Sequence, residues 1–172
     1  MEPGEEIPAT PERLDRIPRA FAHIIDAKSP FTYRHSEGVA TAAVAMVERM
    51  GFAPRAVRDQ EWAGLLHDIG KLGVSNRILD KPGPLTDAER AEIRKHPGLT
   101  YDILSRVTPF RHLAEVAASH HERPGGKGYH RGLKADALSL RARILAVADT
   151  FAAFSQDRPY RPAMPMEKVS PA

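Results

Sequence analysis

The chain has 172 residues, a net charge of +3 and no cysteine. Its length, without internal repeats, indicates one domain, and the lack of cysteine excludes disulfides and thiolate metal sites. The small charge excess comes from scattered arginines, so nucleic-acid binding is not indicated. No apolar run approaches the roughly 20 residues of a membrane span and no signal peptide is evident, so we expect a cytoplasmic protein without a membrane segment.

Apolar residues recur at helical spacing along most of the chain, and no stretch alternates clearly between apolar and polar residues. Helices should therefore predominate. We expect a disordered lead-in or linker over residues 1–10, a single domain over residues 11–163 and a proline-rich tail over residues 164–172.

The first half of the domain predicts three helices. The first covers residues 11–27, and Pro18 should kink it or divide it into two pieces. The second follows a turn at residues 29–32, carries His35 on its inward face and stops at Gly51. The third begins at Pro54 and runs into residues 67–68 before stopping between residues 70 and 73.

The second half predicts a turn-rich connection over residues 75–84 and then further helices. Thr86 and Glu89 have the spacing of a capping box, so a helix should begin there and stop before Pro97, which opens the next helix. Another helix begins near residue 109 and ends at a histidine pair.

A glycine-rich loop occupies residues 122–134, because so many glycines disfavour any helix. The final helix starts near Ser139 and has Asp149 in its middle. Its expected buried positions are Leu140, Ile144, Val147, Phe151 and Phe154.

The most informative stretch is residues 62–73, where the adjacent pair His67-Asp68 lies among apolar residues and is followed by Lys71. Neighbouring helical residues differ by about 100° around the axis, so the imidazole and the carboxylate can point to two positions several ångströms apart. That geometry suits two metal ions with a carboxylate between them. The alternative is a helix end with an incidental His, Asp and Lys, and the dipeptide alone favours this alternative.

The rest of the chain supplies further candidate ligands. Imidazoles and carboxylates are the metal ligands available to a chain without cysteine. Five of the eight histidines and two carboxylates lie on or beside apolar helical stretches: His35, His67, Asp68, His96, His120, His121 and Asp149.

With this ordered set, the sequence resembles the HD-GYP subfamily of the HD phosphohydrolase superfamily. The resemblance covers residues 11–163 and is carried by the stretches "YRHSEGVA", "HDIGKLGVSNRIL", "KHPGLTYDIL", "HHERPGGKGYH" and "ILAVADTFAAFSQDRPYR". It implies an all-α HD-domain bundle of about six to seven helices around a buried metal site. It also implies hydrolysis of cyclic di-GMP to pGpG and further to GMP.

The resemblance implies two divalent ions, iron or manganese, with Asp68 as the bridging carboxylate. One ion would be bound by His35, His67, Asp68 and Asp149, and the other by Asp68, His96, His120 and His121. Two such cations lower the pKa of water and neutralise phosphodiester oxygens. The implied partners are a cyclic dinucleotide, a diguanylate cyclase (GGDEF) domain or an upstream sensory or receiver domain, and a second copy in a homodimer.

The resemblance also assigns roles at the substrate. Lys71 would bind phosphate and act in catalysis as a proton donor to the leaving oxygen; the alternative is a lysine that interacts with the dipole of a helix C-terminus. Gly128 and Tyr129 belong to the signature loop and would contact substrate. Arg158 and Arg161 match phosphate-contacting positions, and their alternative is a solvated charged tail.

Several residues depart from the family pattern. In the signature loop, Gly125 replaces an Asp and His130 replaces a Pro. These changes affect no expected metal ligand, but they lie where the family is expected to recognise its substrate. Phe31 stands where members with three metals carry a Glu, so we expect two ions. Ala152 and Ala153 occupy a stretch that usually holds an Asp-Ala pair, which could weaken support for the ligands.

Because of these departures, two alternatives to cyclic di-GMP hydrolysis remain open. One is a catalytically weak module that binds a nucleotide or a signalling partner. The other is an HD enzyme acting on a different cyclic dinucleotide or on a nucleoside phosphate.

Overall fold

The structure, a computed structural model, describes residues 10–29 and 34–155. This part of the chain contains eight α-helices, three short 3-10 helices and no β-strand; an isolated bridge joins Gly125 to Lys134. The expected all-α class is confirmed. The α-helices are α1 (Pro11–Ala27), α2 (His35–Arg49), α3 (Pro54–Leu66), α4 (Asn76–Leu79), α5 (Asp87–Ile93), α6 (His96–Arg106), α7 (Ala114–Ala118) and α8 (Leu140–Ser155). The 3-10 helices are η2 (Ile69–Gly73), η3 (Thr108–Leu113) and η4 (Ala135–Ala137).

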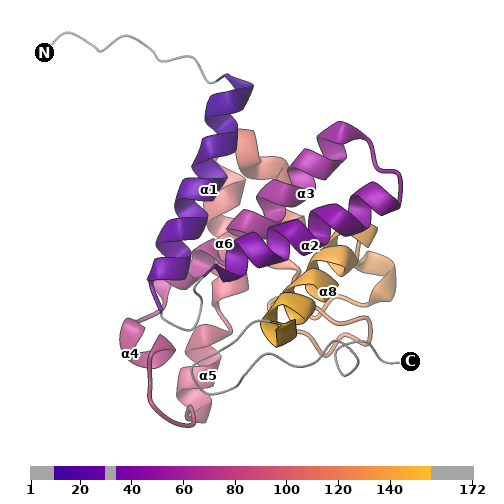
Figure 1. Cartoon of the computed structure of the whole chain (residues 1–172). Helices are drawn as coiled ribbons and strands as arrows, with labels where there is room; N and C mark the ends of the chain where they lie inside the picture. Colours follow the sequence, from indigo (N-terminus) through magenta and orange to yellow (C-terminus); the bar gives the residue numbers. More distant parts are fainter. Residues whose placement is uncertain (1–9, 30–33, 156–172) are drawn as a thin grey trace, which may run out of the picture.

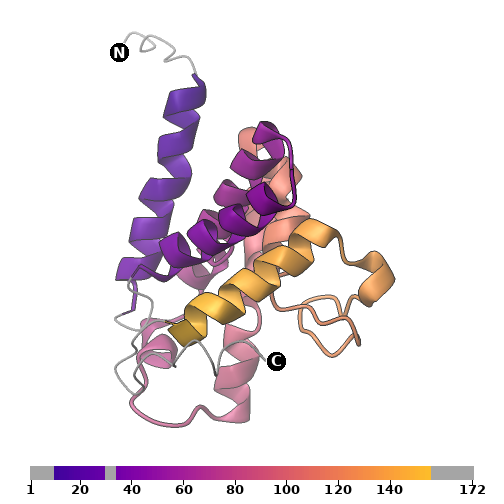
Figure 2. The same cartoon turned by 45° about the vertical axis from the view of Figure 1, so that its right-hand side comes forward.

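Helix α3 is the central element of the bundle. It packs against α1, α2, α7 and α8, and Figure 1 shows it beside α2. Figure 2 shows α1 reaching beyond the other helices at its N-terminal end. Helices α4 and α5 form a small projection at the end of the bundle where α1 ends. Within the described residues, no helix is long and apolar enough to cross a membrane.

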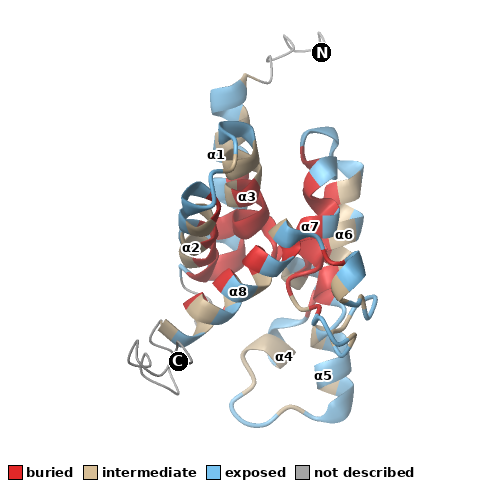
Figure 3. Cartoon of the chain, turned by 90° about the vertical axis from the view of Figure 1, so that its right-hand side faces the viewer, coloured by how far each residue is buried: buried red, intermediate tan, exposed pale blue. Residues whose placement is uncertain are grey.

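Two apolar clusters lie on either side of α3. The first contains Trp62 and Leu66 of α3 packed with Leu104 of α6 and Leu113 of η3. The second contains Ala63 of α3 with residues of α2 and α8, including Val39, Ala43, Val47, Leu145 and Ala148. Figure 3 shows these buried faces turned toward one another, while α4 and α5 are largely exposed. Burial on both sides fixes the rotation of α3 and therefore the direction of the residues that follow it.

Most of the expected helix boundaries are confirmed. Pro54 lies in the first turn of α3, Thr86 and Glu89 form the reciprocal capping box of α5, and Pro97 lies in the first turn of α6. Gly51 follows α2 with a positive φ of 74°. Such a left-handed residue ends a helix at little steric cost when it is glycine.

Three local expectations need correction. α1 is one continuous helix through Pro18, not two pieces. α3 ends at Leu66, so a 3-10 turn and not the α-helix carries the residues after Asp68. The connection over residues 75–84 contains a short helix, α4, whose first turn is capped by Ser75.

The expected buried face of α8 is also wrong in part. Leu140 and Val147 are 50% and 56% exposed, whereas Leu145, Ala148 and Ala152 are buried. The sequence pattern favours the larger side chains, but α8 packs closely on α2 and the small alanines permit that approach. Ala152 is therefore a packing residue in the second cluster.

Candidate metal centre

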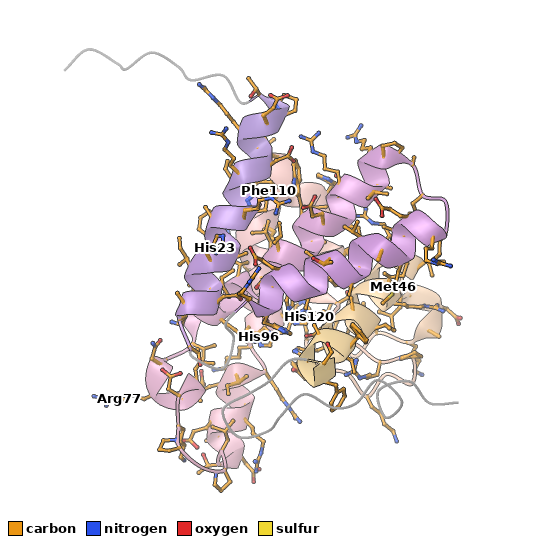
Figure 4. The ribbon with its side chains drawn as sticks, viewed as in Figure 1. His23, Met46, Arg77, His96, Phe110 and His120 are labelled. Carbon is orange, nitrogen blue, oxygen red and sulfur yellow. The ribbon has the colours of Figure 1, made fainter. Side chains whose placement is uncertain are left out.

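The candidate ligands come from the ends of helices that converge on one point. His35 is the first residue of α2, His67 follows α3 directly, and His96 is the first residue of α6. The pair His120-His121 lies in the turn after α7, and Asp149 projects from the middle of α8. Figure 4 shows His96 and His120 close together inside the bundle. His23, also labelled there, lies apart from them on α1.

Three of the imidazoles are oriented by the carbonyl of the residue three positions earlier. The Nδ1 atoms of His67, His96 and His120 lie 2.7, 2.7 and 2.6 Å from the carbonyl oxygens of Gly64, Ile93 and Ala117. A proton on Nδ1 leaves the lone pair on Nε2, which is the arrangement of metal-binding histidines. The local turns thus aim three Nε2 atoms at the interior.

The first group of candidate ligands is His35, His67 and Asp149, whose ligand atoms lie within 4.8 Å of one another. His35 Nε2 is 3.1 Å and His67 Nε2 is 4.0 Å from Asp149 Oδ1. His67 is fully buried and His35 nearly so. This group matches the first of the two ligand sets implied by the resemblance, apart from the shared carboxylate.

The second group is His96, His120 and His121, again within 4.8 Å. The Nε2 atoms of His96 and His120 are only 3.2 Å apart. Because both rings direct their Nδ1 atoms to carbonyls, two lone pairs face each other at this distance. A cation or a proton between them is needed to offset the repulsion.

Asp68 lies between the two groups. Its Oδ2 is 3.3 Å from His67 Nε2, and its Oδ1 is 3.2 Å from His96 Nε2 and 3.6 Å from His120 Nε2. One carboxylate oxygen therefore faces each group, which is the geometry that a bridging ligand requires. The Asp68 side chain is 2% exposed, so its charge is almost completely shielded from water.

Lys71 lies at the edge of the centre. The 3-10 turn η2 places its Nζ 2.5 Å from Asp68 Oδ2, and its side chain is 19% exposed. The ammonium group thus pairs with the candidate bridging carboxylate and still reaches solvent. Lys71 therefore pairs with a carboxylate of the centre, and the phosphate-binding role expected of it stays a prediction.

The charges inside the centre shift several pKa values. Burial opposes a charge on His67, but the carboxylates of Asp68 and Asp149 raise its pKa to about 9. Burial lowers the pKa of His121 to about 3 and holds the pKa of His120 well below its usual range. Burial also disfavours the charge on Asp68, but Lys71 and His67 keep its pKa well below the usual value. Neutral His120 and His121 and ionised Asp68 are thus in the protonation states that bind metals, whereas His67 must lose a proton to bind one.

Two buried atoms test whether a metal ion fits. Within the described residues, His67 Nε2 and Asp68 Oδ1 are buried and make no hydrogen bond. Each nevertheless lies within 3.3 Å of an opposite partner in the cluster. Buried polar atoms without hydrogen bonds are costly, so a set of them converging on one point indicates a cation. The residues present therefore fit divalent metal ions.

Two further residues, which the sequence analysis did not single out, hold the segment 67–70 against α6. The hydroxyl of buried Thr100 donates to the carbonyl of His67 at 2.9 Å and accepts from the amide of Gly70 at 3.0 Å. A Cβ atom on Gly70 would lie 1.9 Å from the carbonyl oxygen of His96. Only glycine permits this approach, which brings Asp68 to His96.

Buried Asp26 positions His35 through hydrogen bonds to the residue that follows it. Its carboxylate accepts hydrogen bonds from the amide of Ser36 at 3.2 Å and from its hydroxyl at 2.7 Å. Arg34, with φ of 53°, precedes the helix and offers it no side-chain cap. Asp26 therefore caps α2 from α1 and fixes its first residue, which is the candidate ligand. An acidic residue in the preceding helix gives no local signal for this role.

The loop over residues 122–134 is fastened to the centre by Glu122. This carboxylate is 2% exposed and accepts from the amides of Arg131, Gly132 and Leu133 at 2.8, 3.1 and 3.0 Å. A Cβ on Gly128 would lie 2.4 Å from Glu122 Cα, so glycine is required where the loop crosses. The loop places the Tyr129 ring 4.6 Å from the His121 ring.

The remaining histidines of the helices lie on the surface, and three residues with expected roles lie outside the described part of the chain. His23 and His112, which match no ligand position in the resemblance, are surface residues near Glu37 and Asp59 respectively. Phe31, Arg158 and Arg161 lie outside the described residues. The roles expected of them stay predictions.

Comparisons with known proteins identify the family of the chain. A family model for the HD domain matches residues 19–169. The chain is 46% identical, over 95% of its length, to the 3'3'-cGAMP-specific phosphodiesterase 3 of Vibrio cholerae serotype O1, and it covers 35% of that protein. It is 42% identical, over 80% of its length, to a cyclic di-GMP phosphodiesterase of Thermotoga maritima and covers 38% of it.

A solved structure extends the comparison. The crystal structure of the cyclic GMP-AMP specific phosphodiesterase V-cGAP3 of V. cholerae matches with a TM-score of 0.55 and 42% identity, over 95% of this chain and 36% of that one. The all-helical fold and the histidine–aspartate centre define a metal-binding domain, and the chain belongs to the HD domain family. Within that family it is an HD-GYP domain with a divergent signature loop. It spans little more than a third of the curated relatives described above.

Proposed function

We propose that this domain is a metal-dependent phosphodiesterase that hydrolyses a cyclic dinucleotide. The observation that carries the proposal is the buried cluster around Asp68, in which two groups of three ligands flank one carboxylate. A single structural metal would not need a second group. Two relatives with 42% and 46% identity are named as phosphodiesterases of cyclic dinucleotides.

The proposed ligands are His35, His67 and Asp149 for one ion and His96, His120 and His121 for the other, with Asp68 shared. Iron(II) and manganese(II) suit such a set of nitrogen and oxygen donors. When bound, a pair of such ions lowers the pKa of water and neutralises phosphodiester oxygens.

The chain's own residues supply positioning and proton transfer. Carbonyl contacts at Nδ1 keep three imidazoles in the orientation that binds metal. Lys71, within reach of Asp68 and of solvent, binds a phosphate oxygen and donates a proton to the leaving oxygen. Burial raises the pKa of Tyr129, so its hydroxyl stays protonated and can donate a hydrogen bond to the substrate beside His121.

Cyclic di-GMP is the leading substrate, linearised to pGpG and then cleaved to GMP. The second candidate is 3'3'-cGAMP, because the relative with 46% identity is named for that substrate. Both molecules present the same phosphodiester to the centre. Their difference lies in one base, which must be read outside the metal cluster.

The proposal is tested by chromatography of the products formed from each cyclic dinucleotide. Protein reconstituted anaerobically with iron(II) or manganese(II) is compared with an Asp68→Ala variant. We expect linear dinucleotide or mononucleotide from the wild type alone, together with loss of metal from the variant. Full activity in the variant would refute the role of the centre.

Unchanged substrates despite full metal occupancy would favour the alternative of a binding module. For that case, and for the proposed partners, the test is capture of a GGDEF, receiver or sensory domain by the purified domain. Sedimentation tests the proposed homodimer, and fractionation of cells tests the proposed cytoplasmic location. A metal count near three per chain would contradict the expectation of two ions.

A further inference from the structure

The Tyr129 ring separates the metal centre from a second cavity. On one side the ring lies 4.6 Å from the ring of His121 and 6.3 Å from that of His96. On the other side it lines an open pocket of about 430 Å³, whose other lining residues come from the loop, α6 and the end of α5. A substrate held at the centre by its phosphate can extend past this ring into the cavity.

The lining combines aromatic surfaces with opposite charges at two ends. Six of its residues carry the argument: Arg94, Lys95, Gly98, Asp102, Tyr129 and His130. Gly98 gives the floor on α6 a flat stretch, and His130 packs over it, since a Cβ there would lie 3.2 Å from His130 Nδ1. A space lined by the Tyr129 and His130 rings favours a planar ligand.

The positive end of the cavity is beside Tyr129. The guanidinium of Arg94 lies 5.4 Å from the centroid of the Tyr129 ring, and Lys95 follows it at the start of α6. Arg94 is exposed, so its hydrogen-bond donors remain available to a ligand. A guanidinium forms paired hydrogen bonds with two adjacent acceptors such as O6 and N7 of guanine.

The negative end is beside His130. Asp102 lies seven residues beyond Lys95, or about 10 Å along the helix axis. Asp102 and His130 both line the cavity. A carboxylate accepts hydrogen bonds and donates none, so it suits the N1–H and N2–H₂ donors of guanine and opposes the N1 lone pair of adenine.

We propose that this cavity, lined by Arg94, Tyr129, His130 and Asp102, is a guanine-binding pocket for one base of the substrate. The inference rests on the proposed function for the nature of the substrate, and it selects the base that cyclic di-GMP and 3'3'-cGAMP share. Arg94 recognises the acceptor edge of the base, Asp102 recognises its donor edge, and the two rings contact its faces. Guanine in this pocket orients the phosphodiester at the centre.

The test is calorimetric binding of 5'-GMP and 5'-AMP to the metal-loaded protein. Both ligands carry the same phosphate, so any difference in Kd reports on the base. We expect GMP to bind at least ten-fold more tightly than AMP, Arg94→Ala to weaken GMP binding about ten-fold, and Asp102→Asn to abolish the preference for GMP. Arg90→Ala is the matched control, because Arg90 lies on α5 four residues before Arg94, pairs with Asp87 and lies outside the pocket. It should change Kd less than two-fold.

The outcomes separate this inference from the proposed function. GMP binding that depends on Arg94, in a protein that cleaves no cyclic dinucleotide, would uphold the pocket and refute the phosphodiesterase. Cleavage of cyclic dinucleotides with the same KM and the same GMP affinity in wild type and Arg94→Ala would refute the pocket alone. Equal affinities for GMP and AMP in the wild type would refute the assignment of guanine.

Discussion

The metal centre and the loop that borders it are built in opposite ways. The candidate ligands of the centre come from α2, α6, α8 and the ends of α3 and α7, and three of the five imidazoles are oriented by backbone carbonyls at helix ends. The loop over residues 122–134 has no regular helix before η4, and one buried carboxylate, Glu122, fastens its backbone.

This difference indicates that the centre determines metal binding and catalysis, whereas the loop determines which substrate binds. Substitutions in the centre should remove metal binding and activity together, because the candidate ligands lie on the packed helices or at their ends. Changes in the loop should alter substrate binding first. Two of the departures from the family pattern, Gly125 and His130, are in the loop, whereas the seven candidate ligands are intact.

The largest effect is expected from Gly70→Ala. The added Cβ would overlap the carbonyl oxygen of His96, which is backbone and cannot rotate away. We expect a loss of stability of about 3 kcal/mol or more and loss of metal binding, measured by denaturant unfolding and metal analysis. Gly125→Ala is the control, since its Cβ would meet nothing within 4 Å. Equal stability of the two variants would contradict the tight junction of η2 and α6.

Metal loading should have the next largest effect. Manganese(II) at one hundred times its Kd should stabilise the wild type by about 2.7 kcal/mol and leave Asp68→Ala unchanged. His67 has a pKa of about 9 without metal, so a proton competes with the ion below that pH. The apparent affinity should fall up to about ten-fold per unit as pH decreases from 8.5 to 6.5. A flat pH profile in calorimetry would show that His67 is not a ligand.

Glu122→Gln should have a smaller effect that is confined to the loop. The amide that replaces one oxygen cannot accept from the loop N–H groups, and we expect a loss of about 1–3 kcal/mol together with a raised KM. Metal content should remain at the wild-type level. Glu115→Gln is the matched control, because Glu115 contacts the same loop through an exposed pair with Arg131. Such pairs contribute little, so a larger effect at Glu115 would reverse our ranking.

The smallest effect is expected at Glu89, near the start of α5. Hydrogen bonds from Lys81 and from the Thr86 amide and hydroxyl lower the pKa of Glu89 from 4.5 to about 2. Its contribution to stability is therefore present above pH 4.5 and is lost as the pH falls through 2. Thermal melts of Glu89→Gln should lie slightly below wild type at pH 6 and converge with it near pH 2. Glu92→Gln, on the same helix, should melt like wild type throughout.

The sequence predicted much of this architecture because its signals are local. The capping box at Thr86, the prolines that open α3 and α6, and the glycine that ends α2 each determine a boundary through their own backbone preferences. The buried face of α8 was predicted less well, because large apolar residues mark a helix but the alanines between them determine how closely α2 can approach.

The candidate ligands were predicted from the sequence, because five histidines and two carboxylates lie on or beside apolar stretches and match the ordered motifs of the family. Tertiary structure decided how they meet. It placed one oxygen of Asp68 toward each group, brought Asp26 of α1 to the start of α2, and directed Glu122 to a loop up to eleven residues further along the chain. These contacts join residues with no shared periodicity, so only the packing of the helices around α3 could bring them together.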